Sequence, residues 1–194
     1  MWFFGVLFLI VSVWGEIPRL ETERLILRGV ELSDAAETME IIGDFEVVKL
    51  TAMNFCQTEE AALSYARFRL KEYEIGLALP WVVIEKGSGQ MVGIASLFDL
   101  SRDQRRGEIS YVLARSAWGK GYATEIAKEL IRFGFNDLNL VRIQGSTHPE
   151  NEASSKVLEK VGMQYEGLLR SYKMTQGKPS DRKMYAIING RNYV

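Results

Sequence analysis

The clearest change of pattern along the chain lies between residues 109 and 136. β-Branched and aromatic residues first indicate a strand; these are Ile109, Tyr111 and Val112. From residue 123 onward, apolar and small residues recur at the spacing of one helical face; these are Ala123, Ile126, Ala127, Leu130, Ile131 and Gly134. The pattern predicts a strand, a turn that contains Gly119 and Gly121, and a helix of about 123–136.

Three more helices are predicted from an N-cap residue that is followed by helical spacing and then by a glycine stop. They are about 34–43 after Ser33, 59–74 after Thr58, and 152–161 after Asn151. Strands are predicted at 22–28, 81–85, 91–98, 141–147, 163–170 and 182–189, and a polar loop at 99–107. Because a hairpin is followed by alternating strands and helices, we expect an α/β fold with a mixed central sheet and helices on both faces.

The chain begins with an apolar stretch, residues 1–15, that carries no charge before Glu16. It is shorter than the roughly 20 residues that a membrane-spanning helix needs, and it lacks the basic start of a signal peptide. Three interpretations remain open: an extra segment ahead of the domain, an element packed on the domain or on a second subunit, and a membrane-associating tail. We expect residues 1–16 to form an N-terminal extension and residues 17–194 to form a single domain. We expect no stable membrane span.

Composition and charge exclude several classes of partner. The chain has 24 Lys and Arg residues against 25 Asp and Glu residues, for a net charge of −1, so general binding to nucleic acid has no electrostatic basis. The single cysteine, Cys56, cannot form an internal disulfide. Its isolation favours a reducing, cytoplasmic setting.

A helix that follows a glycine-containing turn offers unpaired N–H groups and the positive end of its dipole, which suits a phosphate. The turn here lacks the Gly-Lys-Ser/Thr of a P-loop and the spaced glycines of a dinucleotide site. No cluster of Cys and His has metal-binding spacing, and a Ser-His-Asp arrangement would need the one histidine, His148. The turn therefore predicts a phosphate-bearing ligand of another kind.

Five blocks of sequence resemble the GNAT N-acetyltransferases. The first, Trp118-Gly119-Lys120-Gly121-Tyr122-Ala123, is similar to the family's acetyl-CoA pyrophosphate loop, Gln/Arg-x-x-Gly-x-Gly/Ala. Trp118 replaces the usual Gln or Arg, as is typical of the RimJ/RimL branch, which acetylates protein N-terminal amines. The other blocks are Leu20 to Arg28, Gly107 to Tyr111, Asn151 to Ser154 with Leu158 to Met163 behind it, and Asp181 to Ala186.

This resemblance implies a GNAT fold and acetyl-CoA as cosubstrate. Backbone N–H groups of the loop would bind the pyrophosphate; they belong to Gly119, Lys120, Gly121, Tyr122 and Ala123. The backbone of the preceding strand end would pair with the pantetheine arm; its residues are Tyr111, Val112 and Leu113. That strand would splay from residues 142–147 and open a slot. Asn151 would contact the pantetheine; the alternative is that it acts only as an N-cap. Lys156 would lie near a CoA phosphate; the alternative is that it is an ordinary solvent-exposed lysine.

Attack of an amine on a thioester needs a route for the amine proton, a donor for the developing oxyanion and a donor for the leaving thiolate. The resemblance implies Glu108 as the base, with burial raising its pKa, the N–H near Val112 for the oxyanion, and Ser154 for the thiolate. Glu108 could instead be a structural carboxylate or bind the acceptor amine. Ser154 could instead be an ordinary polar residue in the first helical turn.

The acceptor is the part that the sequence predicts least. Where the RimL type carries an acidic residue, this chain has Lys173, with Tyr172 beside it as a spare candidate. We expect a protein N-terminal amine as acceptor. The alternatives are a small amine, such as a polyamine, an amino acid or an antibiotic, and a non-catalytic module that binds CoA or a protein partner. A homodimer is also possible.

Overall fold

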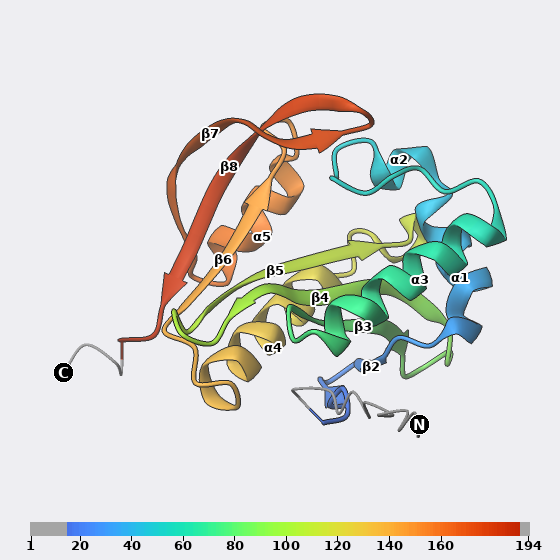
Figure 1. Cartoon of the computed structure of the whole chain (residues 1–194), viewed down its shortest axis with the longest axis horizontal. Coiled ribbons are helices and arrows are strands. Elements are labelled where there is room, and N and C mark those ends of the chain that lie inside the picture. Colours follow the sequence, from blue (N-terminus) through green and yellow to red (C-terminus); the bar gives the residue numbers. More distant parts are fainter. Residues whose placement is uncertain (1–14, 191–194) are drawn as a thin grey trace, which may run out of the picture.

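A computed structural model describes residues 15–190 of the chain, so the apolar stretch and its three interpretations lie almost wholly outside the described residues. The described chain forms one eight-stranded sheet in the order β1-β2-β3-β4-β5-β6-β8-β7 (Figure 1). The strands are β1 (Leu20–Glu21), β2 (Leu25–Gly29), β3 (Ala78–Glu85), β4 (Met91–Ser101), β5 (Arg106–Leu113), β6 (Arg142–Thr147), β7 (Gln164–Thr175) and β8 (Lys178–Ile188). Within residues 15–190, no helix is long and apolar enough to cross a membrane.

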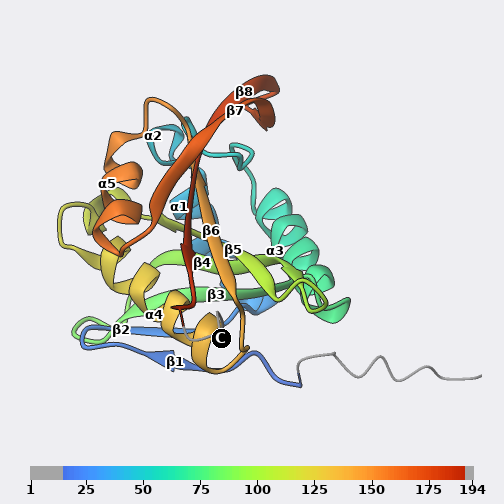
Figure 2. The ribbon, with the colours of Figure 1, turned by 90° about the vertical axis from the view of Figure 1, so that its left-hand side faces the viewer.

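Helices cover both faces of the sheet, as predicted (Figure 2). The helices are α1 (Ala35–Ile42), α2 (Phe45–Val48), α3 (Glu59–Glu74), α4 (Tyr122–Asn136) and α5 (Glu152–Lys160). Successive side chains of a strand point to opposite faces. In β3, Trp81 and Val83 therefore pack in the core under α4 and α5, while Val82 packs in the core under α1 to α3.

The sheet opens between its two parallel strands. β5 and β6 pair only at Arg106↔Arg142, Gly107↔Ile143 and Glu108↔Gln144. Beyond Glu108, β5 continues to Leu113 and β6 to Thr147 without pairing to each other, and Figure 1 shows them diverging. All other neighbouring strands are antiparallel. The splay that the family resemblance implied is therefore confirmed, and it begins at the buried carboxylate.

The predicted N-caps of α3 and α5 are confirmed, but the first helix begins differently. The side-chain oxygens of Thr58 and Asn151 accept hydrogen bonds from the backbone N–H of the third residue of their helices. Ser33, in contrast, lies inside a short 3₁₀ turn, and α1 begins at Ala35. The buried carboxylate of Asp34 accepts from the backbone N–H of Glu31 at 2.7 Å and pairs with Arg28 at 2.5 Å. An ion-paired aspartate therefore takes the place expected for the serine.

Four strand boundaries also differ from the prediction, because mostly polar residues extend the strands without an alternating pattern. Residues 99–107, predicted as a loop, belong mostly to the ends of β4 and β5. β7 and β8 run as far as a two-residue turn, Gln176-Gly177, in which both residues have positive φ, as a tight hairpin requires. The tip of this long hairpin lies next to α2 (Figure 1), where Gln176 Nε2 donates to the backbone carbonyl of Val48 at 3.3 Å. The short helix α2 was not predicted, because four residues show no helical period.

Candidate functional site

Two clefts meet at the point where β5 and β6 separate. One, of about 740 Å³, runs from the end of β5 along the glycine turn to the start of α5. The other, of about 440 Å³, lies between β5, β6, α3 and the β7–β8 hairpin. Six residues line both clefts: Leu50, Thr51, Tyr111, Val112, Asn151 and Ser154. We call the clefts the turn cleft and the hairpin cleft. Two ligands bound in them would therefore meet at these shared residues, among which Tyr111, Val112, Asn151 and Ser154 come from β5 and the start of α5.

The turn cleft collects most of the residues that the sequence assigned to cofactor binding. Its lining includes Tyr111, Val112, Leu113, Gly119, Gly121, Tyr122, Ala123 and Asn151. Lys120 and Lys156 are not among the lining residues. The Lys120 side chain lies 4.0 Å from Glu85, and Lys156 is exposed on α5. The structure therefore does not place either lysine side chain in the lining of this cleft.

The glycine turn has the backbone that the sequence required. Gly119 and Gly121 have φ of +75° and +83°, in the left-handed region that L side chains rarely adopt. A Cβ placed on Gly119 would meet no atom within 4 Å, so the space beside it is open. α4 begins directly afterwards, with Tyr122 buried against the core. The residues present therefore fit a pyrophosphate held by backbone N–H groups at a helix N-terminus.

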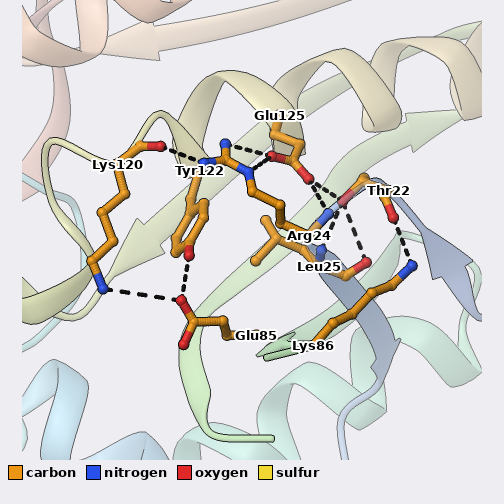
Figure 3. Close-up of polar contacts among 8 residues, drawn as sticks. All are labelled: Thr22, Arg24, Leu25, Glu85, Lys86, Lys120, Tyr122 and Glu125. Atoms are coloured by element: carbon orange, nitrogen blue, oxygen red, sulfur yellow. Dashed lines mark hydrogen bonds and ion pairs between the residues drawn. The ribbon is translucent and has the colours of Figure 1, made fainter. Parts of the chain in front are cut away.

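A network behind the turn anchors it to the first strands (Figure 3). Arg24 Nη1 donates to the Lys120 carbonyl at 2.9 Å, and Arg24 Nη2 lies 2.6 Å from the Glu125 carboxylate. The backbone N–H of Arg24 and the hydroxyl of Thr22 also donate to Glu125, at 2.8 and 2.5 Å. Burial opposes ionisation of Glu125, but these hydrogen bonds from Thr22 and Arg24 hold its pKa below its usual value. We call this network the Arg24 anchor.

A second contact supports the turn from the β3–β4 hairpin. The hydroxyl of Tyr122 donates a hydrogen bond to Glu85. That bond raises the pKa of Tyr122, and the same bond is the main reason that the pKa of Glu85 is lowered. The guanidinium of Arg24 lies 4.6 Å from the centre of the Tyr122 ring. The turn is thus fixed on its inner side while its outer side stays open.

Glu108 lines the hairpin cleft and is buried, with 3% of its surface exposed. Its surroundings are polar rather than the apolar ones expected from the sequence. Ser146 donates to Oε1 at 2.6 Å, Gln144 donates to Oε2 at 3.3 Å, and the Lys173 ammonium lies 2.9 Å from Oε1. Lys173, noted from the sequence only as a departure from the RimL type, is therefore an ion-pair partner of the candidate base.

Tyr111 and Ser154 form a hydroxyl pair at the junction of the two clefts, with their oxygens 3.1 Å apart. Burial raises the pKa of Tyr111 to about 12, outweighing the hydrogen bond with Ser154. The phenol therefore remains protonated at neutral pH. The backbone N–H of Ser154 donates to Asn151 Oδ1 at 3.1 Å, so Asn151 does act as an N-cap while it lines both clefts.

Two arginines in the hairpin cleft were missed by sequence reasoning. Arg182 is 2% exposed and bonds to the hydroxyls of Ser180 and Thr175 at 3.0 and 2.5 Å. Desolvation lowers its pKa, and the charge of Glu108 opposes that shift. Arg69 on α3 pairs with Glu72 at 2.5 Å, and its buried Nε has no hydrogen-bond partner. Arg182 lay within one of the family-like blocks, whereas Arg69 had no signal beyond its place on a helix.

Comparison with known proteins agrees with this geometry. Residues 24–164 match the family described as the acetyltransferase (GNAT) domain, and the chain belongs to that family. It is 31% identical to YoaA of Bacillus subtilis, an uncharacterised N-acetyltransferase, over 90% of this chain and 98% of that one.

Two solved structures are similar over most of their length. A GNAT-family acetyltransferase of Bacillus anthracis has a TM-score of 0.77 and 28% identity, covering 88% of this chain and 98% of that one. RimJ of Mycobacterium smegmatis, in complex with a CoA disulfide, has a TM-score of 0.77 and 27% identity, covering 88% of this chain and 84% of that one. This protein is an N-acetyltransferase, and acetyl-CoA is its cosubstrate.

Proposed function

We propose that this enzyme acetylates a protein N-terminal amine, with acetyl-CoA in the turn cleft and the acceptor in the hairpin cleft. The observation that carries the proposal is the meeting of the two clefts at Tyr111, Val112, Asn151 and Ser154, with Glu108 on the hairpin side. The RimJ/RimL resemblance supports a peptide N-terminus over other primary amines. The single cysteine, Cys56, is buried and free, which is compatible with a cytoplasmic enzyme.

Acetyl-CoA supplies the activated acetyl thioester. The N–H groups of residues 119–123 bind its pyrophosphate. The backbone of Tyr111 to Leu113, which pairs with β4 but not with β6, pairs with its pantetheine arm. Asn151 borders both clefts and orients that arm. A backbone N–H near Val112 that faces away from β4 stabilises the charge that develops on the carbonyl oxygen. We propose no contact for Lys156 beyond a long-range attraction to a CoA phosphate.

Glu108 receives the first proton of the acceptor ammonium, which leaves the neutral amine to attack the thioester carbon. Lys173 must first release Oε1 or share it. As the N–C bond forms and the C–S bond breaks, the Tyr111–Ser154 hydroxyl pair gives a proton to the leaving sulfur. The second proton of the attacking nitrogen then returns to that pair. In sum, the amide forms, CoA leaves as a thiol, and Glu108 holds one proton for release to solvent.

An acceptor screen that detects free thiol tests this proposal. Tetrapeptides with a free N-terminus should release CoA faster than spermidine at equal concentration. The reason is electrostatic, because the hairpin cleft is lined by three cationic side chains and one carboxylate, and a polycation is disfavoured there. N-acetylated versions of the same peptides are the control and should release no thiol above background. A preference for spermidine would overturn the N-terminal assignment.

The hydroxyl pair can be tested by Ser154→Ala and Tyr111→Phe. We expect each to lower kcat, with roughly a 10²-fold loss for the direct proton donor, while the KM for acetyl-CoA changes little. The matched control is Ser155→Ala on the same helix, because Ser155 is buried against Thr147 at 3.1 Å and lines neither cleft. A full rate in both Ser154→Ala and Tyr111→Phe would remove the pair from the mechanism.

A further inference from the structure

We propose that the acceptor amine carries a carboxylate a few bonds away, so that a zwitterionic group enters the hairpin cleft. The proposal rests on the function proposed above and names the chemistry of the acceptor at that same site. Its starting point is the charge of the cleft. The charged lining residues are Glu108, Arg69, Lys173 and Arg182. Three positive side chains thus face one negative side chain.

The partners of these cations differ. The Arg69 charge is compensated by Glu72 at 2.5 Å, and that of Lys173 by Glu108 at 2.9 Å. Arg182 has no carboxylate within ion-pair distance among residues 15–190, although it is 2% exposed; its recorded partners are hydroxyls and a backbone carbonyl. Buried cations are normally paired. The hairpin cleft therefore contains a buried positive charge that an anionic group of a ligand can neutralise.

The ion pair between Lys173 and Glu108 sets a second condition. An acceptor enters at neutral pH largely as an ammonium, and it must reach the carboxylate that Lys173 already contacts. An ammonium without a nearby carboxylate can contact Glu108 only by displacing the ammonium of Lys173. The acceptor ammonium and the Lys173 ammonium then lie close together without a second anion. A polyamine adds still more positive charge, so the cleft opposes both by charge repulsion.

A zwitterion removes this conflict by exchanging partners. Its ammonium contacts Glu108, and its carboxylate contacts Lys173 or Arg182, so one ion pair becomes two with no change in net charge. Lys173 suits the exchange, because its ammonium is on a flexible stem and its side chain is 24% exposed. Arg182 is held by β8 and offers a fixed charge instead. Lys173 is thus a specificity-determining residue for the carboxylate.

This chemistry has two sources: a free α-amino acid and a peptide with an acidic side chain next to its N-terminal residue. Matched pairs separate them. L-Alanine is compared with L-alaninamide, and the C-terminally amidated peptide Ala-Glu-Ala-Ala with Ala-Gln-Ala-Ala. Thiol release gives kcat/KM for each, with spermidine as a fifth acceptor. We expect the carboxylate member of at least one pair to exceed its amide by about 10-fold or more, as for a close charge pair worth 1.4 kcal/mol.

The variant Lys173→Met identifies the residue responsible. It should reduce the preference for the carboxylate member to within about 3-fold, with the amide member losing less or gaining. Lys183→Met on the same hairpin is the matched control, because it removes the same charge from a residue that lines neither cleft; it should keep the preference. Calorimetric binding of free CoA should be unchanged in both variants, which shows that they are folded.

The outcomes are distinguishable. Equal rates within both pairs would overturn the carboxylate inference and leave the N-terminal function standing if the peptides react. A preference confined to the free amino acid would keep the inference and overturn the N-terminal assignment. Fastest reaction with spermidine would overturn both. If Lys173→Met keeps the preference for the carboxylate member of each pair, Lys173 is not the residue that binds the acceptor carboxylate.

Discussion

Replacing Glu108 by glutamine is expected to lower kcat at neutral pH by about 10²- to 10³-fold, the range typical of a lost general base. The amide keeps the size and much of the hydrogen bonding of the carboxylate but cannot accept the proton of an ammonium. The deficit should shrink as the pH rises above the pKa of the acceptor, about 7.7–8.0 for an α-amino group, because the free amine then forms without help. A pH–rate profile of kcat/KM for both proteins measures this.

The control for this experiment is Glu166→Gln. Glu166 is also a carboxylate in an ion pair, with Arg142 at 2.5 Å, but it is exposed and lines neither cleft. The Glu166→Gln variant should have the same pH–rate profile as the wild type. Calorimetric affinity for CoA should be the same in Glu108→Gln as in the wild type, because Glu108 lies outside the turn cleft. A pH–rate profile parallel to that of the wild type, at any level of activity, would show that Glu108 binds or supports rather than takes the proton.

Replacing Arg24 by leucine is expected to weaken CoA binding by roughly 10²-fold. Two contributions are lost together. The carbonyl of Lys120 loses its anchor, and Glu125 loses its cation in the first turn of α4 while it keeps the hydrogen bond from Thr22. The unpaired carboxylate reduces the positive potential at the helix N-terminus and repels a pyrophosphate held there. Isothermal titration with CoA gives the change directly.

The two contributions can be separated. Arg24→Leu combined with Glu125→Gln should recover the charge part of the lost affinity but not the part due to the anchor. Arg28→Leu is a matched control, because it removes an arginine of β2, four residues further along the chain, from a buried carboxylate, Asp34, away from the turn; it should lower the melting temperature but not the affinity for CoA. S-acetylpantetheine, which has no pyrophosphate, should react equally well with wild type and Arg24→Leu. An equal loss with both thioesters would show that the effect is not on the turn.

Much of the donor side could be predicted from the sequence. The helical period of residues 123–136, the two glycines and the N-caps of α3 and α5 are local signals, and the structure confirms the elements they predict. The family-like blocks then supplied the roles of the turn residues, which remain proposals. Local signals sufficed for these elements because the strand, the turn and the helix N-terminus of the proposed phosphate site are contiguous in the chain.

The acceptor side could not be predicted in the same way, because it is assembled from distant segments. Lys173 contacts Glu108 across 65 residues, and Ser146 contacts it across 38. Neither pairing leaves a periodic pattern. Most of β7 is exposed on both faces, so an alternating pattern gave no indication of the length of the hairpin. The family resemblance flagged Lys173 as a departure, but only the three-dimensional structure shows which carboxylate it contacts.

The three residue pairs between β5 and β6 have a consequence for redesign of this enzyme. They join two sets of strands: β1 to β5 form one set, and β6, β8 and β7 form the other. The first set is followed directly by the glycine turn, for which we propose pyrophosphate binding, and the second carries Lys173 and Arg182. Exchange of the β7–β8 hairpin, residues 164–188, with that of a relative would therefore alter the acceptor range while leaving the Arg24 anchor intact. Chimeras made at this boundary would let new acceptors be selected without rebuilding the binding of CoA.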